Sequence, residues 1–349
     1  MYKINMMSKA DAAKGHGVLS AHDEQVALVR DMLGDSFEVM ENARGTSDIT
    51  HYHSINPEFL AGVPFHKKKG TTVGYVHFLP ETVENSIRLP GLARKLFYWY
   101  MIAFYKRMDH LVTVNPYFID ALQKYGVPRE KITYIPNVVS EERFCPLPMQ
   151  RRRKVRREYG LEEEKFTVLS VGQLQKRKGV IDFIRIAQSM PEIQFVWAGG
   201  FSFGKISDGY DEIRQALKDL PDNVRFLGMV ERERMNDIYN MADVMFLASY
   251  EELFPMTILE AMNCGLPIVV RDLEIYQPIL FDYVLKGNTD REFKILLKRL
   301  SMETGFYMEA AHQSFAGHKF YSREHVAQLW RQYYLSLVAG KTEKKAAEN

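Results

Sequence analysis

Cysteine is scarce in this chain, and long hydrophobic runs are missing. Cys145 and Cys264 are the only cysteines, too few and too far apart for a disulfide framework or a zinc-finger pattern. The longest aromatic and aliphatic run, Leu96 to Tyr105, has ten residues, whereas a helix that spans a bilayer needs about 20. The first seven residues lack the apolar run of a secretory signal. We therefore expect a cytoplasmic protein with no membrane-spanning helix.

The chain also lacks a large excess of charge of either sign. Its 46 Lys and Arg residues against 44 Asp and Glu give a net charge of +2, which does not indicate a dedicated nucleic-acid-binding protein. Hydrophobic residues make up 46% of the 349 positions and charged residues 26%. This composition excludes wholesale disorder, and the length suggests two domains.

Short β-like runs alternate with helix-like stretches in both halves. This alternation predicts an α/β protein with two parallel sheets covered by helices. The candidate strands of the first half are Tyr2–Met6, Phe37–Glu41, Ile49–His53, Thr72–Phe78, Leu111–Asn115 and Ile132–Pro136. Those of the second half are Phe166–Val171, Gln194–Ala198, Val224–Leu227, Val244–Ala248 and Pro267–Arg271.

A basic, proline-punctuated segment separates the two halves. It contains Pro146, Pro148 and six cations in the seven residues from Arg151 to Arg157, a composition typical of a linker. Near the end of the chain, apolar residues recur at helical spacing on one face, which predicts a packed helix. We therefore expect a first domain over 1–145, a linker over 146–158, a second domain over 159–321, a helix over 322–339 that returns to the first domain, and a frayed tail over 340–349.

Two glutamates stand out in the block 249–267. The block follows a predicted strand and leads into a helix opened by Pro255 and closed by Gly265. Glu252 is then in a loop at the carboxyl end of a strand, the edge where open α/β sheets bind ligands. Glu260 follows about two helical turns later. The pair could hold opposite ends of an extended ligand; alternatively, Glu252 caps the helix and Glu260 is solvated.

Glu252-x7-Glu260, followed by Cys264-Gly265-Leu266-Pro267, resembles the signature of retaining glycosyltransferases of family 4, which have the GT-B fold of two Rossmann-like domains. Further matches occur in the same order, namely Gly15-His16-Gly17, His77, Val171-Gly172-Gln173 and Lys178-Gly179. The resemblance thus spans nearly the whole chain. More narrowly, the stretches 3–7, 14–20 and 252–267 are similar to Gram-positive enzymes that glycosylate monoglucosyl-diacylglycerol and so build the glycolipid anchor of lipoteichoic acid.

The resemblance implies a role for each matching residue. Glu260 would bind the ribose hydroxyls of a UDP-sugar, Glu252 would reach the transferred sugar, and Lys178 would neutralise the diphosphate. Gly15 and Gly17, without Cβ atoms, would let a loop approach the diphosphate closely, although two glycines alone indicate only a strand-to-helix turn. The remaining residues of the implied donor site are Gln173, Arg177 and Phe254.

Two positions depart from the family pattern. Gln173 stands where the family often has an arginine, so we expect a less positive leaving-group site served by Lys176, Arg177 and Lys178. Pro255 stands where the family often has glycine after phenylalanine, and proline has no N–H to donate. One contact that the family makes to sugar or phosphate is therefore not expected here.

Histidines raise the question of a metal. His77 ends a predicted strand, and the resemblance implies contact with the donor sugar near the reacting carbon; otherwise it hydrogen-bonds the backbone. His51 and His53 point the same way and could ligate a metal, but no third ligand is evident, which favours a structural role. Because the chain has no Asp-x-Asp motif, we expect neither a metal requirement nor a cofactor.

The segment 86–110 has a composition suited to a membrane surface. It combines large apolar residues with several cations and one acid, Asp109, and basic aromatic helices bind the interface of anionic leaflets. Its apolar residues cover most of the circumference, so a core helix is the alternative. The run 151–157 could add to the same surface, or form a solvated linker or a nucleic-acid patch. The expected membrane contacts are Arg94, Lys95, Trp99, Lys106 and Arg107.

The resemblance and these residues together imply a UDP-sugar-dependent hexosyltransferase that acts on glucosyl-diacylglycerol at the inner face of the cell membrane. Because no protein nucleophile is evident, we expect front-face displacement assisted by the leaving phosphate. The alternatives are a family-4 enzyme for a polysaccharide or another lipid, and a non-catalytic membrane-surface protein. The last would be expected to lose Glu252 or Lys178, and both are present. The sequence does not distinguish UDP-glucose from UDP-galactose.

Overall fold

The computed structural model describes residues 1–9, 17–81, 90–201, 204 and 207–347. The chain divides into two compact units. Unit 1 comprises the described residues of 1–138 and of 321–347, and unit 2 comprises those of 139–320. Each unit has a six-stranded sheet, and every strand pairing within the two sheets is parallel.

The sheet of unit 1 has the order β2-β1-β3-β4-β5-β6. Its strands are β1 Tyr2–Met7, β2 Phe37–Glu41, β3 Ile49–Tyr52, β4 Thr71–Val76, β5 His110–Thr113 and β6 Ile132–Tyr134. All six were predicted, with ends that differ by at most two residues. The central strands β3 and β4 contain mostly buried residues, as expected of parallel strands covered on both faces.

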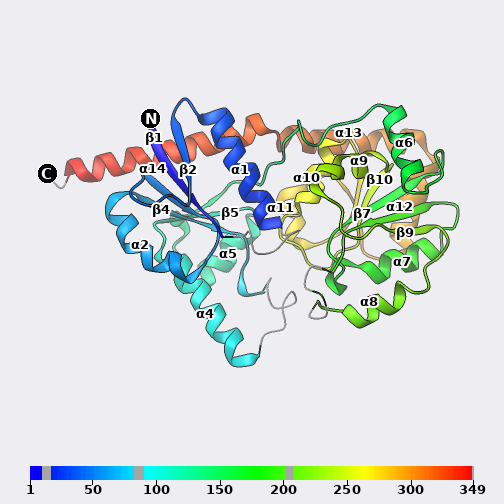
Figure 1. Cartoon of the computed structure of the whole chain (residues 1–349), viewed down its shortest axis with the longest axis horizontal. Helices are drawn as coiled ribbons and strands as arrows, with labels where there is room; N and C mark the ends of the chain where they lie inside the picture. Colours follow the sequence, from blue (N-terminus) through cyan, green and yellow to red (C-terminus); the bar gives the residue numbers. More distant parts are fainter. Residues whose placement is uncertain (10–16, 82–89, 202–203, 205–206, 348–349) are drawn as a thin grey trace. The chain divides into compact units, whose positions relative to one another are not determined.

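Helices cover this sheet, and one of them comes from the far end of the sequence. They are α1 Gly17–Leu33, α2 Pro57–Lys69, α4 Gly91–Arg107, α5 Tyr117–Lys124 and α14 Arg323–Ala347 (Figure 1). The helix α14 packs along α1 and against β3 and β4, with Trp330 and Tyr334 buried. The expectation of a frayed tail from 340 was wrong, because α14 continues to Ala347 through alanine, lysine and glutamate, which favour helices.

The sheet of unit 2 has the order β12-β11-β10-β7-β8-β9. Its strands are β7 Thr167–Val171, β8 Gln194–Ala198, β9 Val224–Phe226, β10 Val244–Leu247, β11 Ile268–Arg271 and β12 Leu285–Gly287. The edge strand β12 was not predicted, because it has only three residues and includes a lysine. Counted within the unit, the order is that of a doubly wound Rossmann sheet, in which the direction of strand addition reverses between β7 and β10.

Eight α-helices lie among the described residues of unit 2. They are α6 Met149–Glu158, α7 Val180–Gln188, α8 Tyr210–Ala216, α9 Met235–Asn240, α10 Met256–Asn263, α11 Gln277–Leu280, α12 Asp290–Met302 and α13 Thr304–Phe320. Shorter 3-10 turns are η3 Lys176–Lys178, η5 Arg232–Arg234 and η6 Glu274–Tyr276. The core beneath α7 is aromatic, since the ring of Phe183 makes edge contacts with Phe195 and Trp197.

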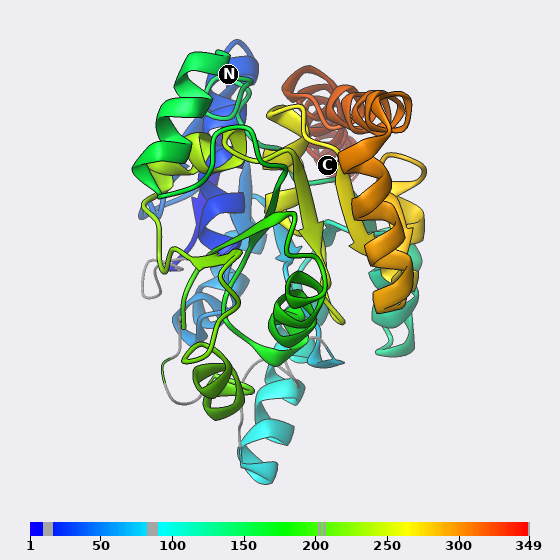
Figure 2. The ribbon, with the colours of Figure 1, turned by 90° about the vertical axis from the view of Figure 1, so that its right-hand side faces the viewer.

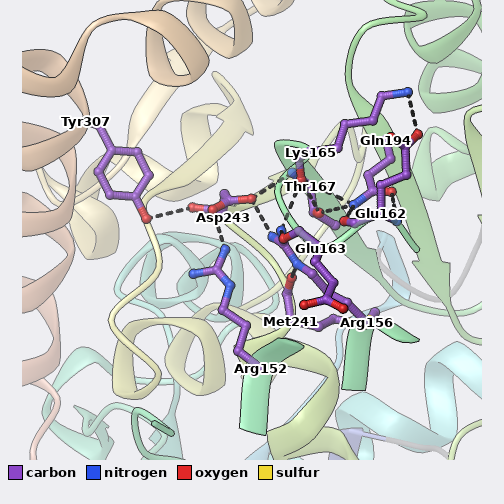
Figure 3. A network of polar contacts seen from close by, with 10 residues as sticks. All are labelled: Arg152, Arg156, Glu162, Glu163, Lys165, Thr167, Gln194, Met241, Asp243 and Tyr307. Carbon is purple, nitrogen blue, oxygen red and sulfur yellow. Dashed lines mark hydrogen bonds and ion pairs between the residues drawn. The ribbon is translucent and has the colours of Figure 1, made fainter. Parts of the chain in front are cut away.

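The expected linker over 146–158 is an integral part of unit 2. It contains α6, and the units divide at 138/139 rather than after 145. Arg156, whose side chain is 4% exposed, donates to Asp243 Oδ2 across 2.6 Å and to the carbonyl of Met241 across 2.8 Å. Arg152 pairs with the other oxygen of Asp243, and Figure 3 shows both arginines converging on this carboxylate.

The remaining arginines of the run are also paired. Arg151 pairs with Asp237, Arg153 with Glu164 and Arg157 with Glu163. Because these ion pairs attach α6 to the rest of unit 2, the interpretation of the run as a solvated linker was wrong. Sequence composition alone does not reveal carboxylate partners that are many residues away.

Candidate active site

The strands β7 and β10 are neighbours at the point where the strand order of unit 2 reverses. Open α/β sheets bind ligands at the carboxyl ends of the strands at such a point. The loop after β7 contains Gln173, Arg177 and Lys178, and the loop after β10 contains Glu252 and Phe254. The fold thus places the predicted donor-binding residues of two separate motifs on neighbouring loops.

Gly179 allows these two loops to approach each other. Its φ is +71°, and a Cβ atom there would lie 2.4 Å from the carbonyl oxygen of Ala248, directly after β10. Any other residue would therefore clash with the backbone as well as adopt an unfavourable conformation. A hydrogen bond of 2.7 Å from the backbone N–H of Tyr250 to the carbonyl of Arg177 joins the loops directly.

Lys178 and Glu252 form an ion pair in this site. Lys178 Nζ lies 2.5 Å from Glu252 Oε1, and the side chains are 16% and 6% exposed. Burial alone would raise the pKa of Glu252, but the charges of Lys178 and Arg177 outweigh it and hold the pKa below its ordinary value. The carboxylate is therefore ionised at neutral pH and engaged with a cation.

Other side chains of the two loops complete this part of the site. Arg177 Nη1 donates to the carbonyl of Glu251 across 3.2 Å, and its buried Nε–H has no hydrogen-bond partner among the described residues. Phe254 is buried and Gln173 half-buried. Pro255 occupies the N-cap position of α10, so the helix starts at Met256, one residue later than expected, and no side chain caps it. The alternative role of Glu252 as a helix cap is therefore wrong.

Glu260 is held at both carboxylate oxygens. Arg232 Nη1 donates to Oε1 across 2.5 Å, and the hydroxyl of Tyr239 donates to Oε2 across 2.5 Å. The side chain of Glu260 is only 3% exposed, so its alternative interpretation as a solvated helix residue was wrong. Since a carboxylate offers about four acceptor positions, two of them are left for a ligand.

No sequence motif marks the groups that surround the two glutamates. Arg232 and Tyr239 come from η5 and α9 and match no motif. The hydroxyl of Tyr276, in η6, is buried without a hydrogen-bond partner among the described residues. Burial and the charge of Glu252 raise the pKa of Tyr276 well above its ordinary value, which places a neutral phenol in the electrostatic environment of the first glutamate.

In unit 1, His77 directly follows β4 and belongs to a buried cluster of histidines. The ring of His53 lies 4.8 Å from that of His22 and 4.5 Å from that of His51, measured between centroids. Nε2 of His77 has no hydrogen-bond partner among the described residues, so the backbone-bonded alternative is wrong for that atom. Burial and His22 lower the pKa of His77 to about 3, and His51 Nδ1 contacts the hydroxyl of Tyr334 across 3.0 Å.

Several expectations about unit 1 concern its glycines and metal binding. Gly15 lies outside the described residues, and Gly17 is the first residue of α1. Within the described part of the chain, no group of three or more histidines, cysteines, aspartates and glutamates is arranged to hold a metal ion. His51 and His53 are buried between the sheet and its covering helices.

The helix α4 has an exposed apolar beginning and a buried end. Leu92, Leu96 and Trp99 are 85%, 63% and 69% exposed, and at this spacing they share one face. Met101, Phe104 and Tyr105 are buried, and Figure 1 and Figure 2 show the first turns of α4 extending away from the sheet of unit 1. No helix in the described residues has the length and hydropathy needed to span a bilayer.

The paired parallel-sheet units and the Glu252–Glu260 site define a glycosyltransferase. Residues 28–143 match the family described as Glycosyltransferase Family 4, and residues 151–289 match Glycosyl transferases group 1. The chain is 41% identical over 332 residues to alpha-galactosylglucosyldiacylglycerol synthase of Streptococcus pneumoniae, covering 95% of this chain and 89% of that relative. It therefore belongs to this family of glycosyltransferases, which confirms the resemblance.

A second relative and a solved structure agree with this assignment. Processive diacylglycerol alpha-glucosyltransferase of Acholeplasma laidlawii is 26% identical over 76% of this chain and 79% of its own. HepE of Anabaena, solved in complex with UDP and glucose, has a TM-score of 0.77 at 16% identity, covering 97% of this chain and all of that one. The predicted α/β fold class, GT-B, is confirmed.

Proposed function

We propose that this chain transfers a hexose from a UDP-hexose to glucosyl-diacylglycerol, with retention of the anomeric configuration. The buried Lys178–Glu252 pair at the strand-order reversal of unit 2 carries the proposal, because it supplies a cation and a carboxylate to one donor. The names of the two relatives, a synthase of galactosylglucosyl-diacylglycerol and a diacylglycerol glucosyltransferase, support a glycolipid acceptor. The first name favours galactose as the transferred sugar.

Each charged group of the site has a part in this reaction. The free acceptor positions on Glu260 bind the ribose hydroxyls, and Arg177 and Lys178 bind the diphosphate together with Gln173. The departing diphosphate gains negative charge in the transition state, so fixed cations stabilise the transition state more than the ground state. No metal ion is needed in this scheme, because the two cations lie within the same turn, η3.

Glu252 exchanges partners when the donor binds. In the structure its carboxylate oxygen Oε1 accepts a hydrogen bond from Lys178 Nζ across 2.5 Å. When the donor binds, the diphosphate accepts from this ammonium instead, and the carboxylate of Glu252 accepts from a hydroxyl of the transferred sugar. Phe254, in the same loop as Glu252, is buried. The acceptor hydroxyl attacks the anomeric carbon on the face from which UDP leaves, and its proton passes to the departing phosphate oxygen.

We assign the membrane contact to α4. Its exposed face presents two leucines and a tryptophan, and Lys95, Lys106 and Arg107 on the same helix are also exposed. Insertion of apolar side chains combined with attraction of cations to anionic lipid is the mode by which interfacial helices bind membranes. This contact would place the enzyme peripherally on the inner face of the cell membrane, where its glycolipid acceptor lies.

A turnover assay tests the proposal. It combines the purified chain with UDP-galactose or UDP-glucose and with glucosyl-diacylglycerol in anionic vesicles. We expect a diglycosyl-diacylglycerol, with galactose preferred, whose new linkage is α by NMR. Glu252→Gln serves as the control that should bind UDP without producing glycolipid. Binding of UDP without turnover on the glycolipid would refute the acceptor and favour a polysaccharide or another lipid, whereas absence of UDP binding would refute the donor.

A further inference from the structure

Both cysteines lie in unit 2 and share one neighbour, the side chain of Asn236 in α9. The Cys264 thiol donates to Asn236 Oδ1 across 3.3 Å, and Asn236 Nδ2 donates to the sulfur of Cys145 across 3.8 Å. The segments that follow the cysteines also run beside each other, since a Cβ on Gly265 would lie 4.0 Å from Cγ of Pro146. A single amide group therefore bridges the two thiols.

The segment that contains Cys145 also supports Glu260. The preceding residue, Phe144, is 1% exposed. The guanidinium of Arg232 lies 5.0 Å from the centre of its ring, and the ring of Tyr239 contacts it edge-on at 5.8 Å. Arg232 and Tyr239 are the two groups that hold the carboxylate of Glu260. A displacement of the Phe144–Cys145 segment would therefore move both partners of Glu260.

Cys264 is linked to Glu260 from the other side. It is the C-cap residue of α10, and its backbone N–H donates to the carbonyl of Glu260 across 3.1 Å. The two cysteines thus lie at the ends of two short paths that meet at Glu260, one at the partners of its carboxylate and the other at its backbone carbonyl. A covalent bond between them would act on Glu260 through both paths.

We infer that Cys145 and Cys264 form a redox-sensitive pair whose disulfide weakens the binding of a nucleoside diphosphate at Glu260. The contact of both thiols with one amide is observed, while the consequence of a disulfide for the nucleotide rests on the proposed function. A disulfide needs Cα atoms about 4.4–6.8 Å apart and a sulfur–sulfur bond of about 2.05 Å. Asn236 must leave its place between the thiols, and its hydrogen bonds to both sulfurs break.

The oxidant is a low-molecular-weight disulfide, such as glutathione disulfide. Cys145 is the more exposed of the two, and its thiolate attacks one sulfur of the oxidant, releasing one thiol and leaving a mixed disulfide. Cys264 then loses its proton and attacks the sulfur of Cys145, releasing the second thiol. Two cysteine thiols are oxidised and one small disulfide is reduced to two thiols. Burial and Glu260 raise the pKa of Cys264, so this second, intramolecular step is the slower one, because little of its thiolate is present at neutral pH.

The full-length chain treated with glutathione disulfide tests the inference. We expect both thiols to disappear, a linked Cys145–Cys264 peptide lighter by two hydrogens in mass spectrometry, and UDP affinity at least about tenfold weaker by calorimetry, as for the loss of one charged contact. Dithiothreitol should restore both the thiols and the affinity. The affinity of the reduced chain for UDP separately tests the proposed function.

Cys145→Ser and Cys264→Ser are the matched controls, since a serine hydroxyl at 264 can keep the hydrogen bond to Asn236 Oδ1. Each variant should bind UDP like the reduced chain and be insensitive to the oxidant. The inference is overturned by two thiols that survive oxidation, by a stable glutathione adduct on Cys145, or by a disulfide that leaves UDP affinity unchanged. It is also overturned if the serine variants lose UDP affinity on oxidation.

Discussion

Replacement of Glu252 by glutamine should strongly lower turnover while leaving UDP binding unchanged or tighter. The Glu252 carboxylate holds Lys178 Nζ at 2.5 Å, and both side chains are mostly buried. A diphosphate beside Lys178 must compete with this carboxylate for the ammonium and is repelled by its charge. The neutral amide of glutamine has the same size but removes the repulsion and weakens the competition.

The size of the effect follows from the contact that is exchanged. A hydrogen bond between charged groups contributes about 1.5–3 kcal/mol net. When residue 252 is a neutral glutamine, the diphosphate gains part of this free energy, because it no longer competes with a charged carboxylate for Lys178. We therefore expect UDP affinity between unchanged and about tenfold tighter, where about 1.4 kcal/mol corresponds to a factor of ten. Turnover should fall by about 10²–10³, as when a single group that stabilises transition-state charge is removed.

Calorimetric titration with UDP and a turnover assay with UDP-hexose measure the two quantities. Glu260→Gln is the matched control, the same substitution at a carboxylate that Arg232 and Tyr239 hold for the ribose. It should weaken UDP binding by about tenfold or more, so the two variants change affinity differently. Full turnover by Glu252→Gln, or UDP binding in that variant as weak as in Glu260→Gln, would refute the assigned roles.

Three further outcomes follow from the structure. Turnover should persist in EDTA, because Arg177 and Lys178 supply the positive charge at the diphosphate; complete loss that a divalent ion restores would contradict this. Burial lowers the pKa values of His51, His53 and His77 below 6.5, so the unfolded chain binds more protons than folded unit 1. Its stability should be full above about pH 6.5 and fall as the pH drops below that value, and urea midpoints that stay level between pH 7.5 and 5 would argue against it. On α4, replacing Leu92, Leu96 and Trp99 with serine should weaken binding to anionic vesicles in cosedimentation by more than about tenfold, since burial of one large apolar side chain contributes about 1.5–3 kcal/mol. Replacing Arg94, Lys95, Lys106 and Arg107 with glutamine should weaken it most at low salt, while serine at Ile295, Met302 and Met308, which are also exposed but belong to unit 2, should change little. Equal binding by the α4 variants and the unit 2 control would remove α4 as the membrane contact.

The sheet architecture was predictable because buried parallel strands are encoded by short local runs of apolar residues. Every strand predicted from the sequence occurs, whereas the edge strand β12 was missed because its three residues, Leu285–Gly287, include a lysine and are mostly half-buried. The prediction of a linker at the arginine run was wrong for a different reason. The run is held in a helix by ion pairs with Asp243 and Asp237, which are more than 80 residues away in the sequence. Such distant carboxylate partners cannot be recognised from the local composition.

The site was predictable as far as its motifs extend. The positions of Glu252 and Glu260 in the loop and helix after β10 could be inferred from a strand, a proline and a glycine in order. Their ion-pair and hydrogen-bond partners could not, because Arg232 and Tyr239 lie on elements with no motif of their own. The ion pair between Lys178 and Glu252 was not predicted either, because both residues were expected to contact the donor.

Two residues of the candidate donor site depart from the family pattern. Gln173 and Pro255 remove one cation and one N–H that family members often supply, yet the site retains a positive group that is only partly satisfied. Arg177 Nε–H is buried without a partner among the described residues, and a buried unpaired donor costs about 1–3 kcal/mol. In the proposed binding mode, a diphosphate would accept from this group and relieve that cost while it takes Lys178 from Glu252. Part of the binding energy of the donor would then come from a polar group that lacks a partner within the described residues, and this would offset the loss of the other donors.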